Sequence, residues 1–466
     1  MRVNTLSHPG RLSRRAALRL LSGALLVLAV ASMAGQLSGG SARADSVPTY
    51  WVNNTNDSGP GSLRQAIIDS NNYSHVKRIG FNIPGNGVKT IYPRSPLPPL
   101  GGSQVYVDGT TQPGYDSAGR PRIEINGSMA GPDASGLTFA TPVGPSSVDG
   151  LIINRFGKHG INIFCTSGNC AANTQNIHVG NSYVGTDANG TADAGNGGDG
   201  IHLAGAEHDF SSQGGPGPAL LTVEDSVISG NGGHGVWARF SRVTLKGSRI
   251  GTDLFGQDDL GNALDGVHLD QSAAVIGGDE GEERNVISGN DGNGVRIGRV
   301  PDGLDIPTYP AELRLSVLVG GNYIGTNAAG NAKLGNAKNG ILVLPGVDPY
   351  IGSNDLIYNY PLGRNVISGN GESGIKITGS SVTVWDNYIG TDAAGNFALG
   401  NETNGVLLSS PTPALIPGRN TLLSGGNQIG WYSPEKSNVI SGNGGDGIRI
   451  EGASNGNVLR YNLIGT

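Results

Sequence analysis

Four side chains suited to ligand binding occupy equivalent positions in neighbouring repeats of this sequence. Each lies two residues after the glycine of a Gly-Ile/Val-x-Ile/Leu segment: His202, Trp237, His268 and Arg296. An indole can stack on a sugar ring, and imidazole or guanidinium groups can hydrogen-bond its hydroxyls or a carboxylate. We interpret the four residues as a candidate ligand-binding site. Leu342 and Leu407 hold the same position later, so an unspecialised exposed surface remains the alternative.

Three kinds of short apolar segment recur in fixed order and make these positions equivalent. The first begins at Gly160, Gly200, Gly235, Gly266, Gly294, Gly340, Gly374, Gly405 and Gly447. The second is less regular, as in residues 221–224, and the third has the pattern Asn/Ser-x-Ile/Val. The third segment alternates between an Ile-Ser-Gly-Asn form with a short turn and a Gly-Thr form with a longer loop. The repeating unit is therefore a pair of coils.

Three short strands per turn of about 30 residues favour a stacked coil over hairpins. Each strand would pair in parallel with its equivalent one turn on, and one apolar interior would run along the stack. Alternation within residues 447–450 then predicts Ile448 and Ile450 inside and Arg449 outside. The sequence predicts an all-β protein.

A small polar residue also recurs two positions before the Ile/Val of the third segment. The nine residues are Ser182, Ser226, Ser248, Asn285, Asn322, Asn365, Asn387, Asn438 and Asn462. The alternation places them inside, where stacked amides can hydrogen-bond along the coil axis. We predict a structural ladder rather than a catalytic set.

The region before the repeats has a different pattern. Residues 61–71 predict one helix, with Ser62 as N-cap and an apolar side formed by Leu63, Ala66, Ile67 and Ile68. Strands are expected near residues 51, 79–83, 105–108 and 123–125. We expect residues 45–130 to form an N-terminal cap with the first irregular coils, and residues 131–466 to form the repeats. The chain stops inside a coil, which predicts a truncated array.

Residues 1–44 are predicted to be an export signal, with cleavage before Asp45. A basic start is followed by an apolar stretch, and Ala42 and Ala44 supply small residues before the cleavage point. Residues 13–19 resemble a twin-arginine signal in part, so both export routes stay open. The signal contains six Arg and no acids, which leaves 25 Lys+Arg against 37 Asp+Glu, a formal charge of −12. This charge argues against nucleic acid partners and anionic membranes.

The two cysteines, Cys165 and Cys170, are expected to form a disulfide that closes a small loop in an exported protein. Two thiols are too few for a metal site, so no metal or cofactor is assigned. Acidic residues near 279–283 lack regular ligand spacing but keep calcium possible. Asp187, Asp253, Asn327 and Asp392 recur in the long loops, and turn capping is the better account of them.

The N-terminal segment 53–67, which contains Gly-Ser-Leu-Arg-Gln-Ala-Ile, resembles the CSLREAI-type motif of large bacterial surface proteins. Gly61 replaces the Cys of that motif, and Gln65 replaces its Glu. Residues 107–115 and the Asn-Tyr-Ile-Gly-Thr-Asp repeats are similar to the same group, the right-handed parallel β-helix proteins of the pectin-lyase-like superfamily. The resemblance covers about residues 50–466 and implies a right-handed single-stranded parallel β-helix with a short helix covering its core, together with an extracellular location. It implies little about activity.

Hydrolases of this superfamily use clustered carboxylates with Gly-His-Gly and Arg-Ile-Lys elements. Gly233, His234 and Gly235 match the Gly-His-Gly element, but no acidic pair precedes them. We therefore expect a non-catalytic secreted or cell-surface repeat protein, a spacer or adhesin, and a monomer. A carbohydrate-binding module and a polysaccharide lyase or hydrolase are the alternatives. Extracellular polysaccharide or a cell-surface protein would be the partner.

Overall fold

The computed structural model describes residues 47–465 except 116–118, 141–142, 165–174, 206–218, 280, 299–316, 346, 354–360, 380, 410–425 and 453–455. Residues 1–46 lie outside this range. The predicted export signal and the predicted Cys165–Cys170 disulfide both lie outside the described residues and stay predictions. No helix among the described residues has the length and apolarity needed to cross a membrane.

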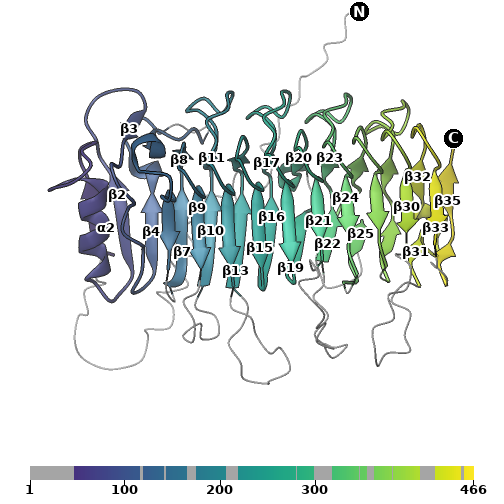
Figure 1. Ribbon diagram of the computed structural model, residues 1–466, viewed down its shortest axis with the longest axis horizontal. Helices are drawn as coiled ribbons and strands as arrows, with labels where there is room; N and C mark the ends of the chain where they lie inside the picture. Colours follow the sequence, from purple (N-terminus) through teal and green to yellow (C-terminus); the bar gives the residue numbers. More distant parts are fainter. Residues whose placement is uncertain are drawn as a thin grey trace, which may run out of the picture. The chain divides into compact units, whose positions relative to one another are not determined.

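The chain from Val47 onward is a right-handed parallel β-helix, as the sequence predicts (Figure 1). Every turn contributes one strand to each of up to three parallel sheets. Sheet A contains β1 (Thr49–Val52), β2 (Lys77–Phe81), β4 (Val105–Asp108), β7 (Val143–Asp149), β10 (Gln175–Gly180), β13 (Ala219–Glu224), β16 (Ser241–Lys246), β19 (Ala273–Gly277), β22 (Val317–Gly320), β25 (Tyr350–Gly352), β28 (Thr383–Trp385), β31 (Gln428–Ile429) and β34 (Val458–Leu459).

The other two sheets complete each turn. Sheet B contains β3 (Lys89–Ile91), β5 (Ile123–Asn126), β8 (Leu151–Asn154), β11 (Tyr183–Val184), β14 (Val227–Ile228), β17 (Arg249–Ile250), β20 (Val286–Ile287), β23 (Tyr323–Ile324), β26 (Val366–Ile367), β29 (Tyr388–Ile389), β32 (Asn438–Ile440) and β35 (Asn462–Ile464). Sheet C contains β6 (Leu137–Phe139), β9 (Ile161–Phe164), β12 (Ile201–Ala204), β15 (Val236–Arg239), β18 (Val267–Asp270), β21 (Val295–Ile297), β24 (Ile341–Val343), β27 (Ile375–Ile377), β30 (Val406–Ser409) and β33 (Ile448–Glu451). From β9 onward, sheet C therefore consists of the Gly-Ile/Val-x-Ile/Leu segments.

Side-chain alternation within the strands places the apolar residues in one core that follows the coil axis. In β12, Ile201 and Leu203 are fully buried, whereas His202 between them is half-buried on the outside. The alternation fails in β33, where Ile450 is 47% exposed. The reason is that β33 is the last strand of its sheet, so no further strand covers it.

Sharp corners between sheets A and B are closed by the nine predicted ladder residues. The residue before the ladder position is left-handed in several coils, as in Asp225 (φ 50°) and Asp386 (φ 51°), a conformation that costs about 1–2 kcal/mol outside glycine. Asn side chains then donate to the next amide oxygen from Asn285 to Asn462 at 2.9–3.0 Å. The serines before them continue the chain, because each accepts a backbone N–H from the preceding coil. Side-chain hydrogen bonds thus stabilise the corner.

A second amide ladder lies between sheets B and C. It was not predicted from the sequence. It consists of Asn196, Asn231, Asn262, Asn290, Asn336, Asn370, Asn401 and Asn443. Each Nδ2 donates to the next Oδ1 at 2.8–2.9 Å and also to a strand carbonyl of the preceding coil, as from Asn370 to Ile324. Most of these amides are fully buried, so nearly all their polar groups are paired inside the coil.

Helix α2 (Leu63–Asn71) begins after Ser62, whose side chain accepts the N–H of Gln65. This confirms the predicted helix and its cap. Its apolar side differs in one residue from the prediction, because Ile68 is 41% exposed and Ser70 is buried instead. Residues 63, 66, 67 and 70 follow the three- and four-residue spacing of one helix face, whereas residue 68 does not. That face packs against β1 and β2 at the start of the stack.

The second ladder predicts a large effect of a single amide. Asn370→Ala should lower the free energy of unfolding by about 2 kcal/mol or more, because it removes three hydrogen bonds from a fully buried site, those with the amides of Asn336 and Asn401 and with the carbonyl of Ile324. Urea unfolding followed by circular dichroism measures the change. Asn396→Ala is the matched control, since its side chain is exposed. Equal midpoints for the two variants would contradict a stabilising ladder.

Candidate functional site

The outer face of sheet C carries one side chain per coil in single file. In order along the sheet this stripe comprises Asn162, His202, Trp237, His268, Arg296, Leu342, Lys376, Leu407 and Arg449. The four residues singled out from the sequence are therefore consecutive, one rung of about 4.8 Å apart. Whether they bind a ligand stays a prediction.

The stripe is less open than alternation alone predicts. Trp237 is half-buried, and the side chain of His268 is only 6% exposed. The ring of Trp237 stacks on that of His202, with centroids 4.3 Å apart and planes 10° apart. Rings on adjacent rungs lie at about stacking distance, so one face of the indole is covered by His202. The expectation of an open indole platform for a sugar is corrected in this respect.

A second row of side chains lies beside the stripe, one residue before the glycine of each strand of sheet C. In four successive coils this row contains His159, Asp199, His234 and Asp265. All four lie outside the strands, and only His234 was singled out from the sequence, through its Gly-His-Gly element. The missed signal was the alternation of His and Asp with the two-coil period of the loops.

The first cluster comprises His159, Asp199 and His202. Oδ2 of Asp199 lies 2.7 Å from Nδ1 of His202 and 3.4 Å from Nδ1 of His159. The backbone N–H of Asp199 donates to Nδ1 of His159 at 3.0 Å. The two imidazole rings stack with centroids 4.1 Å apart and planes 24° apart. Each of the two histidine side chains is 23% exposed.

The second cluster, formed by His234, Asp265 and His268, repeats these contacts one coil pair later. Oδ2 of Asp265 lies 3.0 Å from Nδ1 of His268 and 3.6 Å from Nδ1 of His234. The N–H of Asp265 again donates to Nδ1 of the first histidine, at 3.1 Å. Its rings cross at 61°. The second cluster is less accessible, with His234 14% and His268 6% exposed.

The hydrogen bonds of the first cluster determine where its imidazole protons lie. A backbone N–H can only donate, so Nδ1 of His159 accepts and the neutral ring carries its proton on Nε2. A carboxylate can only accept, so Nδ1 of His202 donates to Asp199. The same reasoning assigns an Nε2 proton to His234 and an Nδ1 proton to His268.

Burial shifts the pKa values in both clusters. Burial, with a smaller contribution from the neighbouring histidine, lowers the pKa of His159 and that of His234 to about 4. Burial raises the pKa of Asp265, but hydrogen bonds from His268 and Asn293 outweigh it and bring that pKa to about 2. The pKa of Asp199 is lowered in the same way by His202 and the N–H of His234. Both carboxylates are therefore ionised at neutral pH.

Each cluster offers two imidazoles and a carboxylate, which are ligands that Zn²⁺ or Ni²⁺ accept. An ion about 2 Å from each nitrogen must lie close to the plane of each ring. The near-parallel rings of His159 and His202 cannot both satisfy this condition. The lone pair of Nδ1 is also already used in His159 and in His234. The first cluster therefore does not fit a metal ion in this arrangement, and in the second cluster Nδ1 of His234 is not free to bind one.

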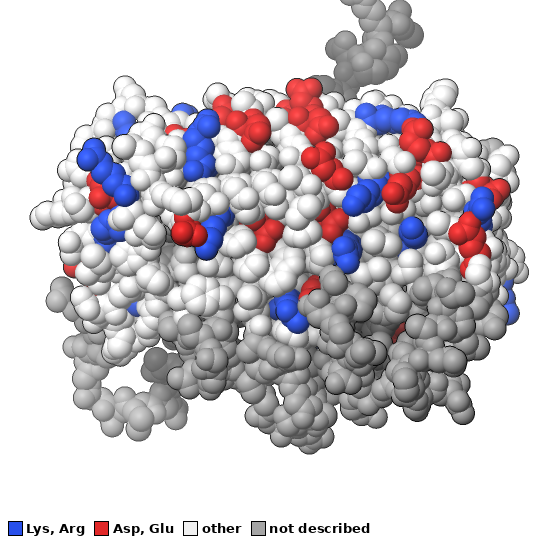
Figure 2. Space-filling view, viewed as in Figure 1, with Lys and Arg blue, Asp and Glu red and all other residues white. Residues whose placement is uncertain are grey.

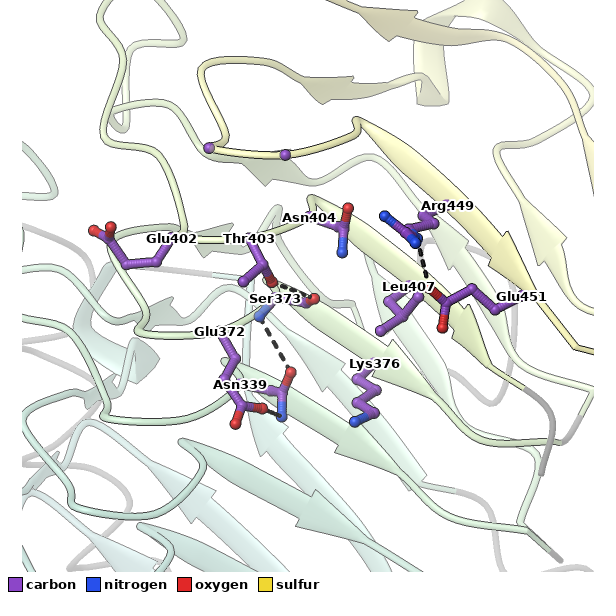
Figure 3. A pocket seen from close by; sticks show the side chains of 12 residues that line it. Asn339, Glu372, Ser373, Lys376, Glu402, Thr403, Asn404, Leu407, Arg449 and Glu451 are labelled. Atoms are coloured by element: carbon purple, nitrogen blue, oxygen red, sulfur yellow. Dashed lines mark hydrogen bonds and ion pairs between the residues drawn. The ribbon is translucent and has the colours of Figure 1, made fainter.

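A shallow groove of about 610 Å³ extends over the same face of sheet C further along the stack (Figure 3). The stripe residues Lys376, Leu407 and Arg449 line it, together with side chains from the turns before the strands. Arg449 pairs with Glu451, whereas Lys376 makes no hydrogen bond or ion pair with a described residue. The groove thus contains one unpaired cation.

The long loops are held by turn capping, which supports that account of their acidic residues. Oδ1 of Asp187 accepts the N–H groups of Thr191 and Ala192, and Asp253, Asn327 and Asp392 repeat this pattern. The loops also bond one another, because Leu254 donates to Gly190, Ala328 to Gly256 and Ala393 to Gly330 at 2.7–2.8 Å. Each long loop therefore contacts the next across an intervening short coil. Calcium binding stays untested.

Surface charge is dispersed on the face drawn in Figure 2, where acidic and basic residues alternate without a large region of one sign. Several charged residues form pairs, such as Arg64 with Asp57 and Lys246 with Glu283. Such a surface provides no broad basic patch of the kind that nucleic acids bind.

No protein-family model matches this chain, and no curated protein sequence matches it. Solved structures give likenesses at low identity. The periplasmic alginate epimerase AlgG is 10% identical with a TM-score of 0.46, over 84% of this chain and 77% of that one. The A-module of the Azotobacter vinelandii mannuronan C-5 epimerase AlgE6 is 13% identical with a TM-score of 0.42, over 86% and 95%. Tailspike protein 3 of bacteriophage CBA120 is 11% identical with a TM-score of 0.30, over 92% and 64%. These likenesses concern the fold alone.

The histidines predict a specific pH profile, measurable by NMR of ¹³C-labelled histidine with His→Gln variants for assignment. His159 and His234 should stay neutral down to about pH 4, below their ordinary pKa of 6.5. As the pH falls from 6.5 to 4, the two histidines become protonated in the unfolded chain but not in the folded chain. The free energy of unfolding should therefore fall through that window. His159→Gln should reduce the fall.

His178 in β10 provides the internal contrast. Hydrogen bonds to Asp149 and Glu224 raise its pKa to about 9, so its stabilising charge should be fully present below pH 6.5 and lost as the pH rises to about 9.

Ordinary titration of His159 near 6.5 would show that its ring is hydrated and that the packing described above is wrong.

Proposed function

We propose that this protein is an exported β-helix protein that binds an extended acidic polysaccharide along the outer face of sheet C. The observation that carries the proposal is the alternation of cations and leucines in the stripe. Arg296, Lys376 and Arg449 come from short-turn coils, and Leu342 and Leu407 lie between them. The cations are therefore two rungs, about 10 Å, apart. A chain of sugars with regularly spaced carboxylates matches such a row.

A free cation on this face is Lys376. Glu402 pairs with Lys333 and Glu451 pairs with Arg449, whereas Glu372 accepts a hydrogen bond from Asn339 and keeps its charge. Lys376 is unpaired among the described residues. Screening confines electrostatic effects to about 8 Å in physiological salt, so the acidic balance of the whole chain acts only weakly at this residue. A carboxylate would complete the hydrogen bonds of Lys376.

The proposal favours the carbohydrate-binding interpretation over a simple spacer. A spacer needs the coil and its ladders but gives no role to the groove or to the alternating stripe. Display on a cell surface remains compatible with binding, because a stiff coil would hold the polysaccharide along its length. The proposal assigns no catalytic step.

Binding to polygalacturonate, alginate and neutral dextran tests the proposal by isothermal titration calorimetry. We expect binding of at least one uronic acid polymer, weakened by salt, and none of dextran. Lys376→Glu should weaken that binding about tenfold or more, because it replaces a charge-assisted hydrogen bond by repulsion. Arg242→Glu is the matched control, since Arg242 is an exposed cation on sheet A.

The outcomes separate the possible functions. Equal loss in both variants would indicate unspecific charge attraction rather than a site on sheet C. Release of unsaturated or reducing ends from the bound polymer would replace the binding function by lyase or hydrolase activity. Absence of binding to every polymer would refute the proposal and return the spacer interpretation.

A further inference from the structure

The two Nε2 atoms of the first cluster, in His159 and His202, differ in character although their rings lie side by side. The Nε2 of neutral His159 carries a proton, because its Nδ1 accepts the N–H of Asp199. The Nε2 of neutral His202 carries a lone pair, because its Nδ1 donates to the carboxylate. The cluster therefore holds one hydrogen-bond donor next to one acceptor, with the ring centroids 4.1 Å apart.

Both Nε2 atoms are available for a ligand. Neither forms a hydrogen bond with a described residue, and neither is among the buried side-chain atoms that lack a partner. Each imidazole is 23% exposed. Asp199, which sets both protons, is only 11% exposed and is itself fixed by the backbone N–H of His234 at 2.7 Å. The pair is therefore oriented before any ligand arrives.

We infer that His159 and His202 form a binding site for two adjacent hydroxyl groups of a sugar. This inference rests on the proposed function and adds a second kind of recognition to the same face. One sugar hydroxyl accepts the Nε2 proton of His159, and its neighbour donates to Nε2 of His202. The carboxylates of the polysaccharide are left to the cations from Arg296 onward.

The chemistry of the pair selects hydroxyl groups over ions. A carboxylate has no proton for the Nε2 lone pair of His202, and the nearby charge of Asp199 repels it. A metal ion cannot use the Nε2 of His159, which carries a proton. A hydroxyl both donates and accepts, so a vicinal diol satisfies the two nitrogens together. Neutral hydrogen bonds of this kind add specificity with little dependence on salt.

The second cluster has the same residue types but a different exposure and ring geometry. It has the same two proton positions, but His268 is only 6% exposed and its ring crosses that of His234 at 61°. Two sugar oxygens cannot approach both of its nitrogens side by side. We therefore assign the second cluster a structural role, in which it fixes the turns of two successive coils.

The experiment compares polygalacturonate with the same polymer after periodate cleavage and borohydride reduction. That treatment breaks the vicinal diols and keeps the carboxylates. With the intact polymer, His202→Ala and His159→Ala should each weaken binding about 3- to 10-fold, as expected for one neutral hydrogen bond. With the cleaved polymer the same substitutions should have almost no effect. His75→Ala, which removes an exposed histidine outside sheet C, should change neither affinity, and circular dichroism checks that each variant is folded.

Long-range ¹H–¹⁵N NMR of the free wild-type chain gives an independent readout. It should show His159 protonated at Nε2 and His202 protonated at Nδ1, and the opposite assignment would overturn the inference without any ligand. If Lys376→Glu weakens binding of the intact polymer but His202→Ala does not, the inference fails while the proposed function stands. If wild-type protein binds alginate but not polygalacturonate, the same comparison uses cleaved and intact alginate. If neither polymer binds, both proposals fail.

Discussion

The buried amide ladders at the two corners of the coil are the interaction on which the rest of the structure depends. From Asn196 onward, Asn side chains of one ladder or both bond the equivalent residues of the next coil, so these coils are held directly over one another. A slip of one residue would turn the inward side chains outward, and it would also break the amide chain. The ladders therefore enforce the register that brings His159 against His202 and His202 against Trp237. The register that the ladders fix at the corners thus aligns the side chains on the outer face of sheet C.

Much of the fold could be predicted from residue spacing because a parallel coil repeats its environment at every turn. The glycines before each strand of sheet C and the polar residues at Ser182 to Asn462 mark the same places in each coil. Residue spacing does not predict the second ladder, although each of its asparagines belongs to a recurring motif. They alternate between the Ile-Ser-Gly-Asn turns and the ends of the long loops, so their equivalence appears only when loops of unequal length bring the chain back to one corner.

The candidate site could be predicted less completely. The stripe follows from side-chain alternation, and its order in space is the order in the sequence. The contribution of His159 and Asp199 depends on the turn before the strand, where the alternation of His and Asp extends over only four coils. Proton positions depend on a backbone N–H and a carboxylate oxygen that meet only in the folded coil. The burial of His268 likewise depends on neighbours from two other coils, and alternation along one strand contains no information about them.

The contacts between successive long loops constrain how such a chain can change its length. Leu254 bonds Gly190, and Ala328 bonds Gly256, each across one short coil. Gain or loss of a single coil would place two long loops or two short turns next to each other, and would shift the cation–leucine order of the stripe by one. Gain or loss of two coils would keep the long loops and short turns in alternation and would restore the contacts between long loops. Recombination between repeats can therefore lengthen or shorten this protein without breaking the loop contacts only in increments of about 10 Å. The coil pair, and not the single coil, is the unit that can be duplicated or deleted.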